Sequence, residues 1–396
     1  MTVYDFDEPI DRHGTDSLKF DRAESRHRSA DLLSLWVADM DFRAPQPAID
    51  ALVERSRHGI FGYTEPGDAY YAAVGNWMET RHNWHVEPEW FVHTPGIVGA
   101  LALCVQAFTR PGDAVLVQQP VYYPFSEVIA DNGRTVANAA LVYGNGRYEI
   151  DFEAFERTLT EYGAKLFLLC NPHNPGGRVW TAEELRRLGE ICNAHDVLVV
   201  SDEIHMDFAQ PGFAHTAYAS LGRKFADRCV VCTSAGKTFN LAGLQTSNII
   251  VPNPQLRRTL RAQVSKSGYS QPNTMGVVAT QACYEHGGEW LDQLKAYLAG
   301  NIELVESHLG TTAPELKVMR PESTYLVWVD ARELGLYGKD LVRFIEDEAG
   351  LWLDCGDMFG KDGDGFIRIN VATQRAYLQK ALDQLIAAVE RRRVRG

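Results

Sequence analysis

Three short apolar runs in this sequence each end in polar side chains that can do chemistry. The run Lys165–Cys170 is followed by NPHNPGG at 171–177, and Val197–Val200 is followed by SDEIH at 201–205. The run Cys229–Cys232 leads into TSAGKT at 233–238. Ligands of an open parallel sheet bind beyond the carboxyl ends of its strands. If the three runs are neighbouring parallel strands, an asparagine, an aspartate and a lysine meet at one rim of the sheet.

The lysine of this group, Lys237, lies at the end of a predicted buried strand, where lysine is rarely found without a partner. Burial lowers the pKa of an amine, and the neutral amine can form a Schiff base with a carbonyl compound. Pyridoxal phosphate is the aldehyde cofactor that most often uses such a lysine, and a carboxylate keeps its pyridine nitrogen protonated. Lys237 and Asp202 together therefore predict covalent catalysis with this cofactor.

Other kinds of site fit these residues less well. Gly236-Lys237-Thr238 resembles the end of a nucleotide-binding P-loop, but that motif requires glycine at position 231, where the sequence has valine. The sequence has no GxGxxG after a predicted strand, no GxSxG elbow and no HExxH. DEIHMD at 202–207 offers metal ligands, but Asp202 and Glu203 would point to opposite sides of an extended backbone. We therefore expect no metal site.

The elements that must position these residues follow from the hydrophobic pattern. Short, non-alternating apolar runs separated by amphipathic stretches are typical of parallel strands covered by helices. The predicted strands are Ala114–Gln118, Lys165–Cys170, Val197–Ser201, Cys229–Thr233 and Ser247–Val251. The clearest helix is Thr181–His195, where Thr181 and Glu184 form a capping box.

From about residue 286 the pattern changes to long amphipathic stretches around short strands. The predicted helices are Trp290–Leu309, Lys339–Ala349 and Tyr377–Arg392, with strands at Tyr325–Val329 and Phe366–Val371. We expect an α/β fold with a mostly parallel central sheet, helices on both of its faces and a smaller α+β domain. The expected boundaries are 1–45 for an N-terminal arm and part of the small domain, 46–285 for the large domain and 286–396 for the rest of the small domain.

Composition limits the possible partners. The chain has 396 residues, enough for two or three domains, and its 45% hydrophobic and 23% charged residues are ordinary for a globular protein. Its formal net charge of −13 repels nucleic acid and acidic membranes. The basic tail, Arg391-Arg392-Arg393 and Arg395, is better explained as a solvated helix terminus. We expect neither a nucleic-acid nor a membrane partner.

The sequence also predicts a cytoplasmic protein. Its amino terminus lacks the order of charges and apolar residues of a signal peptide, and no apolar run approaches membrane-spanning length. The seven cysteines are odd in number and scattered, which fits reduced thiols. Cys229 and Cys232 match a redox or half-zinc spacing, but within an apolar run they are better explained as buried strand cysteines.

Four motifs in order along the chain resemble those of fold-type I pyridoxal-phosphate enzymes of the aminotransferase superfamily. They are NPHNPGG at 171–177, SDEIH at 201–205, SxxK at 234–237 and IRIN at 367–370. LWVADMDF at 35–42, DEIHMD at 202–207 and KTFNLAGL at 237–244 look like the MalY/PatB branch of cystathionine β-lyases, also called cysteine-S-conjugate β-lyases. The resemblance implies α,β-elimination of L-cystathionine or a related sulfur amino acid to pyruvate, ammonia and a thiol.

Two alternatives share the same fold. One is a pyridoxal-phosphate-dependent aminotransferase, which uses the same residues until its last steps. The other is a protein that binds a transcriptional regulator, as bifunctional members of this branch suggest.

The resemblance implies a role for each matching residue around the cofactor. Lys237 would carry it and move the proton at the substrate α-carbon, and Asp202 would pair with the pyridinium nitrogen. Asn174 would donate to the phenolic oxygen, Tyr122 rather than Tyr123 would stack on the ring, and His205 would be a further neighbour.

The remaining roles concern the phosphate and the substrate. The backbone N–H groups of Ile97 and Val98 and the hydroxyl of Ser234 would bind the phosphate. Tyr63 would reach the phosphate of a neighbouring subunit, which implies a homodimer with shared active sites. Arg368 would hold the substrate carboxylate bidentately. Gln245 stands where many members of the superfamily have a phosphate-binding arginine.

Overall fold

A seven-stranded sheet dominates the computed structural model, which describes residues 3–395. Its strand order is β2 (Phe91–Thr94), β10 (Ser247–Ile250), β9 (Cys229–Thr233), β8 (Leu198–Asp202), β7 (Leu166–Cys170), β3 (Ala114–Val117) and β4 (Thr135–Asn138). The pairs β4–β3, β3–β7, β7–β8 and β8–β9 are parallel, so the three motif-bearing strands are neighbours as predicted. The expectation of a mostly parallel central sheet is confirmed.

The expectation that Ser247–Val251 is a parallel strand is wrong. β10 is antiparallel to both of its neighbours, β9 and β2. A parallel connection has to carry the chain across one face of the sheet, usually as an α-helix. Between β9 and β10 the chain instead forms only the short helix α8 (Ala235–Thr238) and a 3₁₀ turn, Ala242–Leu244, before it returns along β9.

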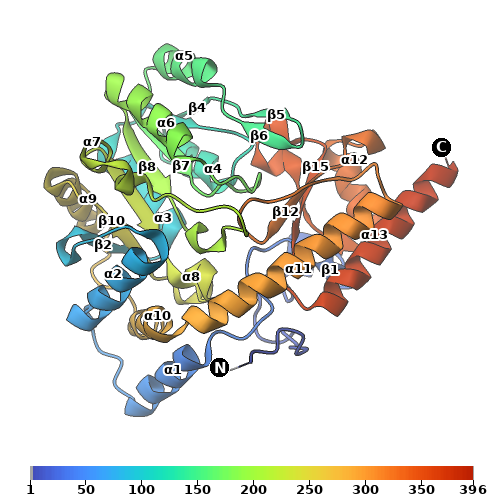
Figure 1. Ribbon diagram of the computed structural model, residues 1–396, viewed down its shortest axis with the longest axis horizontal. Helices are drawn as coiled ribbons and strands as arrows, with labels where there is room; N and C mark the ends of the chain where they lie inside the picture. The colour runs from blue at the N-terminus through green and yellow to red at the C-terminus, as the bar shows by residue number, and fades with distance from the viewer. Residues whose placement is uncertain (1–2, 396) are drawn as a thin grey trace.

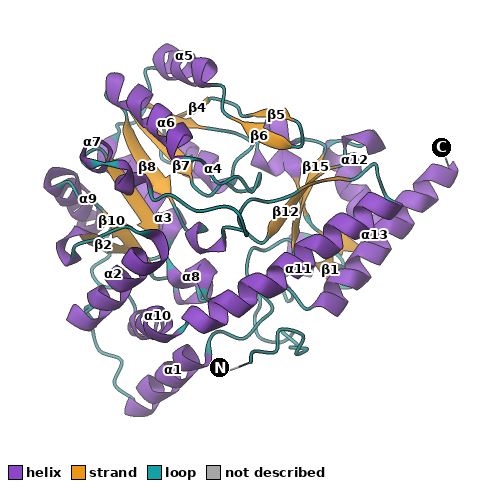
Figure 2. Ribbon diagram, viewed as in Figure 1, coloured by secondary structure: helices purple, strands orange, loops and turns teal. Residues whose placement is uncertain are grey.

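Helices cover both faces of the sheet, as Figures 1 and 2 show. On one face, α3 (Ile97–Phe108), α4 (Pro124–Asp131) and α9 (Pro254–Lys266) share a hydrophobic cluster with alternate strand residues. On the other face lie α2 (Asp68–His82), α5 (Phe152–Tyr162), α6 (Ala182–Ala194), α7 (Arg223–Ala226) and α10 (Thr274–His286). Every residue of β7, β8 and β9 is buried, which explains why these runs do not alternate with polar residues.

The second sheet is antiparallel and has the order β11 (Lys317–Met319), β12 (Leu326–Asp330), β15 (Phe366–Asn370) and β14 (Asp354–Cys355). The helices near it are α11 (Gly288–Thr312), α12 (Gly338–Arg343), which continues as a π turn over Phe344–Glu348, and α13 (Arg375–Arg395). In Figure 1, α11 and α13 lie side by side across this part of the molecule. The strands and helices expected here are confirmed, with ends that differ by three residues at most, and the π turn was not expected.

Residues 3–40 contain little regular structure and pack against this second sheet region. β1 (Leu33–Ser34) pairs in parallel with β13 (Leu351–Trp352), and Leu35 accepts a hydrogen bond from the backbone N–H of Asn370. The remaining elements are α1 (Gln46–His58) and the hairpin of β5 (Val142–Gly144) and β6 (Arg147–Glu149). The domain boundaries at 45/46 and 285/286 stay predictions. Met1 and Thr2 of the predicted arm, and Gly396, lie outside the described residues.

The predicted capping box begins α6. Thr181 Oγ1 accepts from the backbone N–H of Glu184 (3.1 Å), and Glu184 Oε2 accepts from the backbone N–H of Thr181 (2.8 Å). Two of the free N–H groups of the first turn are thereby satisfied by side chains. The helix follows the loop that carries Asn174, so its start fixes one end of that loop.

Replacing the cap tests this local contribution. We expect Thr181→Ala to lower the free energy of unfolding by about 1 kcal/mol, because the Glu184 N–H loses its acceptor. Urea unfolding followed by circular dichroism measures the change. Thr160→Ala is a matched control, because Thr160 is also exposed but donates to the Glu156 carbonyl within α5. A cap variant as stable as this control would contradict the prediction.

Candidate active site

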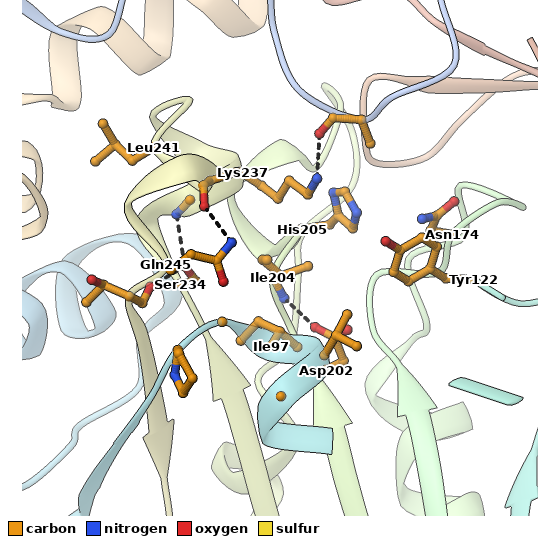
Figure 3. A pocket seen from close by; sticks show the side chains of 18 of the residues that line it. Ile97, Tyr122, Asn174, Asp202, Ile204, His205, Ser234, Lys237, Leu241 and Gln245 are labelled. Atoms are coloured by element: carbon orange, nitrogen blue, oxygen red, sulfur yellow. Dashed lines mark hydrogen bonds between the residues drawn. The ribbon is translucent and has the colours of Figure 1, made fainter. Parts of the chain in front are cut away.

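A cavity of about 260 Å³ opens at the carboxyl ends of β7, β8 and β9. Residues from these strand ends, from the start of α3 and from the N-terminal arm line it. Eight of the residues singled out from the sequence are among them: Ile97, Val98, Tyr122, Asn174, Asp202, His205, Ser234 and Lys237. Figure 3 labels all of these except Val98 and shows their side chains facing this common space. The sheet therefore brings together residues that are up to 140 positions apart, from 97 to 237.

Lys237 projects into the cavity from α8, the short helix that follows β9. Ser234 caps this helix by accepting from the Gly236 N–H (3.0 Å), and the Lys237 Nζ donates to the carbonyl oxygen of Ala38 in the N-terminal arm (2.5 Å). Burial lowers the pKa of Lys237 to about 8, with Arg368 acting in the same direction and the carboxylates of Asp39 and Asp202 opposing it. A substantial fraction of the amine is therefore neutral near pH 8.

Asp202 and His205 face the cavity from the end of β8 and the loop after it. Burial raises the pKa of Asp202 to about 7, although the Ile204 N–H donates to its carboxylate (3.1 Å). Burial lowers the pKa of His205 to about 3, and the charges of Lys237 and Arg368 lower it further. His205 is therefore neutral, and its buried Nδ1 has no hydrogen-bond partner among residues 3–395.

The start of α3 forms another wall of the cavity. Gly96 precedes the helix with a φ of 98°, and no side chain of the described residues caps the N–H groups of the first turn. The positive φ favours glycine at this position, and a Cβ there would also lie 2.9 Å from Gln245 Oε1. The uncapped N–H groups at Ile97 and Val98 are suited to an anion. Ser234 lies nearby, but its hydroxyl already donates to the Thr246 carbonyl (2.8 Å).

Asn174 and Tyr122 approach the cavity from the loops after β7 and β3. The Tyr122 backbone N–H donates to the Asn174 carbonyl (3.0 Å), which joins the two loops. Arg368, on β15 of the second sheet, donates through Nη1 to Asn174 Oδ1 (3.0 Å). This bond fixes the orientation of the amide, so that the Asn174 NH₂ group is free to donate elsewhere. Arg368 lies behind Asn174 and is not part of the cavity wall itself.

Tyr63 is the second predicted site residue, after Arg368, that does not line the cavity in the single chain. Its side chain is 98% exposed, in a segment with the exposed Ile60 and Phe61. Together with residues 270–275 this segment borders a separate surface hollow. Tyr63 can therefore reach an active site only if that site belongs to another copy of the chain.

Three residues next to the site were not predicted from the sequence. Ala38 accepts from Lys237 through its backbone carbonyl, which no side-chain pattern can indicate. Asp354 forms an ion pair with Arg368, and the two are direct cross-strand partners of β14 and β15. Asp207 accepts from Thr238 Oγ1 (2.6 Å), next to Lys237 in sequence. The last two contacts become visible only once register and loop path are known.

Asp202 and Glu203 point to opposite sides, and Cys229 and Cys232 lie in a buried strand. Asp202 faces the cavity, whereas Glu203 lies on the other side and binds Ser201 Oγ (2.8 Å) and His215 Nε2 (2.9 Å). In the described chain, 3–395, no three His, Cys, Asp or Glu side chains are grouped as metal ligands. Cys229 and Cys232 are buried, unpaired residues of β9.

Comparison with known proteins connects this geometry to enzymes. The family model for class I and II aminotransferases matches residues 30–385. The chain is 44% identical to cystathionine β-lyase PatB of Bacillus subtilis, over 97% of this chain and 99% of that protein. It superposes on cystalysin from Treponema denticola, a structure that contains pyridoxal 5′-phosphate, with a TM-score of 0.95, 35% identity and coverage of 98% of this chain and 100% of that one. A pyridoxal-phosphate-bound C–S lyase from Staphylococcus hominis gives a TM-score of 0.91, 34% identity and coverage of 98% and 98%.

Asp207 holds α8 in place through its hydrogen bond with Thr238. Its buried carboxylate accepts from Trp77 Nε1 (3.0 Å) and Thr238 Oγ1 (2.6 Å), and lies 2.8 Å from His82 Nε2. Burial acts to raise the pKa of Asp207, but these hydrogen bonds, that from His82 foremost, hold it below its ordinary value. The loop after β8 and the lysine helix are thus tied to each other and to α2.

We expect Thr238→Val to lower the free energy of unfolding by about 1–3 kcal/mol, because it removes one donor from a buried carboxylate without changing the side-chain shape. Thr238→Ser keeps the hydroxyl and should cost less than about 1 kcal/mol. Urea unfolding of both variants measures the difference. Equal stability of the valine variant and the wild type would show that the contact does not hold α8.

Proposed function

Because the chain belongs to the class I and II aminotransferase family, we propose that it is a pyridoxal-phosphate-dependent carbon–sulfur β-lyase acting on L-cystathionine or a related cysteine S-conjugate. The products are pyruvate, ammonia and a thiol, which is homocysteine when cystathionine is the substrate. The relatives named as cystathionine β-lyases and C–S lyases favour elimination over transamination. The fold is that of fold-type I pyridoxal-phosphate enzymes.

The observation that carries the proposal is that Lys237 and Asp202 face one cavity whose far wall is an uncapped helix start. Pyridoxal phosphate has an aldehyde, a pyridine nitrogen and a phosphate, and these need an amine, a carboxylate and an anion site. The buried Nδ1 of His205, which has no partner among residues 3–395, also indicates a ligand that supplies a missing contact. The residues present therefore fit this cofactor.

When bound, pyridoxal phosphate joins the substrate amine and takes up the electron pair that is left when the Cα–H bond breaks. Lys237 is the residue that reaches the reacting carbon. Because burial lowers its pKa to about 8, the free amine is present at moderately alkaline pH and can accept the α-proton. The same amine returns a proton as the products leave.

Asp202 and His205 set the charge at the ring end of the site. The Asp202 carboxylate, with a pKa of about 7 in the apo-protein, gains a cationic partner when a protonated pyridine nitrogen lies beside it, and that partner favours the ionised carboxylate. His205 stays neutral and so adds no positive charge that would compete for Asp202. Tyr122 provides an aromatic face for the ring, and the Asn174 NH₂ group donates to its phenolic oxygen.

The phosphate binds to neutral donors. The N–H groups of Ile97 and Val98 provide the positive end of the α3 dipole, and Ser234 contributes its hydroxyl if the bond to Thr246 is exchanged. Gln245 lines the same wall and offers an amide instead of a charged group. Arg368 binds the substrate carboxylate next to Asn174.

The complete site belongs to a homodimer. The partner subunit's Tyr63 adds a hydroxyl to the phosphate, which explains why so large an aromatic side chain is exposed in the single chain.

No helix within residues 3–395 is long and apolar enough to cross a membrane. We place the enzyme in the cytoplasm, where its seven unpaired cysteines stay reduced.

Purified protein incubated with pyridoxal phosphate and L-cystathionine, without any keto acid, should release pyruvate and a free thiol in equal amounts. Lys237→Ala should lower this rate by at least about a hundredfold, because it removes the group that moves the α-proton. Lys317→Ala, at an exposed lysine of β11, is the control and should retain activity. No pyruvate from the wild type, or an active Lys237→Ala variant, would refute the assignment.

The rate at which the apo-protein takes up pyridoxal phosphate should rise with pH through a midpoint near pH 8 and level off above about pH 9. The neutral amine is the reactive form, and the pKa of Lys237 is about 8 instead of the ordinary value of about 10.4. The change in cofactor absorbance after mixing measures the rate. Asp39→Asn removes a carboxylate that raises this pKa, so its midpoint should move to lower pH. A rate that still climbs near pH 10 would contradict the prediction.

A further inference from the structure

Arg368 is almost completely engaged with the protein before any substrate arrives. Its side chain is 2% exposed and donates to Asn174 Oδ1 through Nη1 (3.0 Å). Through Nη2 it donates both to the Trp36 carbonyl (3.0 Å) and to Asp354 Oδ2. Its Nε is buried and has no partner in the part of the chain that the structure describes.

This arrangement conflicts with bidentate binding of a second carboxylate. A guanidinium group offers two such edges, one formed by Nε and Nη2 and the other by Nη1 and Nη2. Both edges use Nη2, and both hydrogens of Nη2 already have acceptors. A substrate carboxylate can therefore form a two-point contact only when the Trp36 carbonyl or the Asp354 carboxylate gives up its bond.

Asp354 is the partner whose charge matters. It lies on β14 directly opposite Arg368 on β15, and its side chain is 4% exposed. Its negative charge neutralises the guanidinium, so the pair presents little net positive charge to an incoming anion. Burial raises the pKa of Asp354 in spite of the opposing effect of Arg368, which indicates that the guanidinium does not fully compensate for the lost hydration.

Resting on the role proposed above for Arg368, we propose that Asp354 is a specificity-determining residue that competes with the substrate carboxylate for the Nη2 donor of Arg368. The competition weakens binding of every substrate or product that carries an α-carboxylate. Neutral amino-acid derivatives do not experience it. Asp354 thus sets how strongly the site holds a carboxylate, and it takes no part in the bond-breaking steps.

The test is binding to the holoenzyme of L-alanine and of L-alaninamide, two ligands that lack a β leaving group and differ only in the carboxylate. Asp354→Asn keeps the acceptor oxygen and the shape but removes the charge. We expect the dissociation constant of L-alanine, measured from the cofactor absorbance, to fall by roughly tenfold, since a charged competitor is lost. That of L-alaninamide should change by less than about twofold. The KM for L-cystathionine should fall in parallel, with kcat little changed.

Asp330→Asn is the matched control, because it breaks another Asp–Arg pair of the same sheet, with Arg332, away from the cavity. It should leave both dissociation constants unchanged. Asp354→Ser supplies a second uncharged variant if the asparagine variant folds poorly, and we expect the same direction. Unchanged or weaker L-alanine binding in the folded variant would overturn the inference. Failure of the wild type to release pyruvate, with L-alanine binding intact, would instead refute the lyase assignment.

Discussion

The parallel register of β7, β8 and β9 is the constraint on which the site depends. Cys170 lies opposite Asp202, and Asp202 lies opposite Cys232. The loops that follow the three strands therefore begin side by side at the same edge of the sheet. All three strands are buried on both faces, and a shift of one residue would turn every side chain to the other face. The register of the three strands is therefore fixed. It sets the positions of Asn174, Asp202 and Lys237 relative to one another at the edge of the sheet.

The number of hydrogen-bond donors distinguishes the structural carboxylate of Asp207 from the carboxylate of Asp202, which faces the cavity. Asp202 and Asp207 are five residues apart and both buried, yet their pKa values shift in opposite directions. Asp207 has three donors, from Trp77, Thr238 and His82. Asp202 has one, from the Ile204 backbone. With only one donor, the buried charge of the ionised Asp202 carboxylate is poorly stabilised. A cationic partner in the cavity stabilises it.

The sequence was sufficient to predict features that depend on a residue type at a particular place within one helix, strand or strand end. Lys237 at a strand end, the Thr181–Glu184 cap and the all-apolar strands are local signals, and the structure confirms their placement. The direction of β10 could not be read from its apolar composition, since direction depends on whether the connecting chain crosses a face of the sheet. Asp354 was missed for a related reason. Fourteen residues separate it from Arg368, and only the antiparallel register of β14 and β15 makes them neighbours.

The loop from Trp36 to Ala38 contacts both ends of the site through backbone carbonyls alone. Trp36 accepts from Arg368, and Ala38 accepts from Lys237 and from the Tyr325 hydroxyl. A group that joins the Lys237 amine covalently removes hydrogens from Nζ, and a carboxylate on Arg368 draws on the donors that hold Trp36. Ligand binding at Lys237 or Arg368 would therefore draw on hydrogen bonds that also hold this loop. The loop would keep its bonds from the Tyr325 hydroxyl to Ala38 and from the Asn370 amide to Val37 and Asp39.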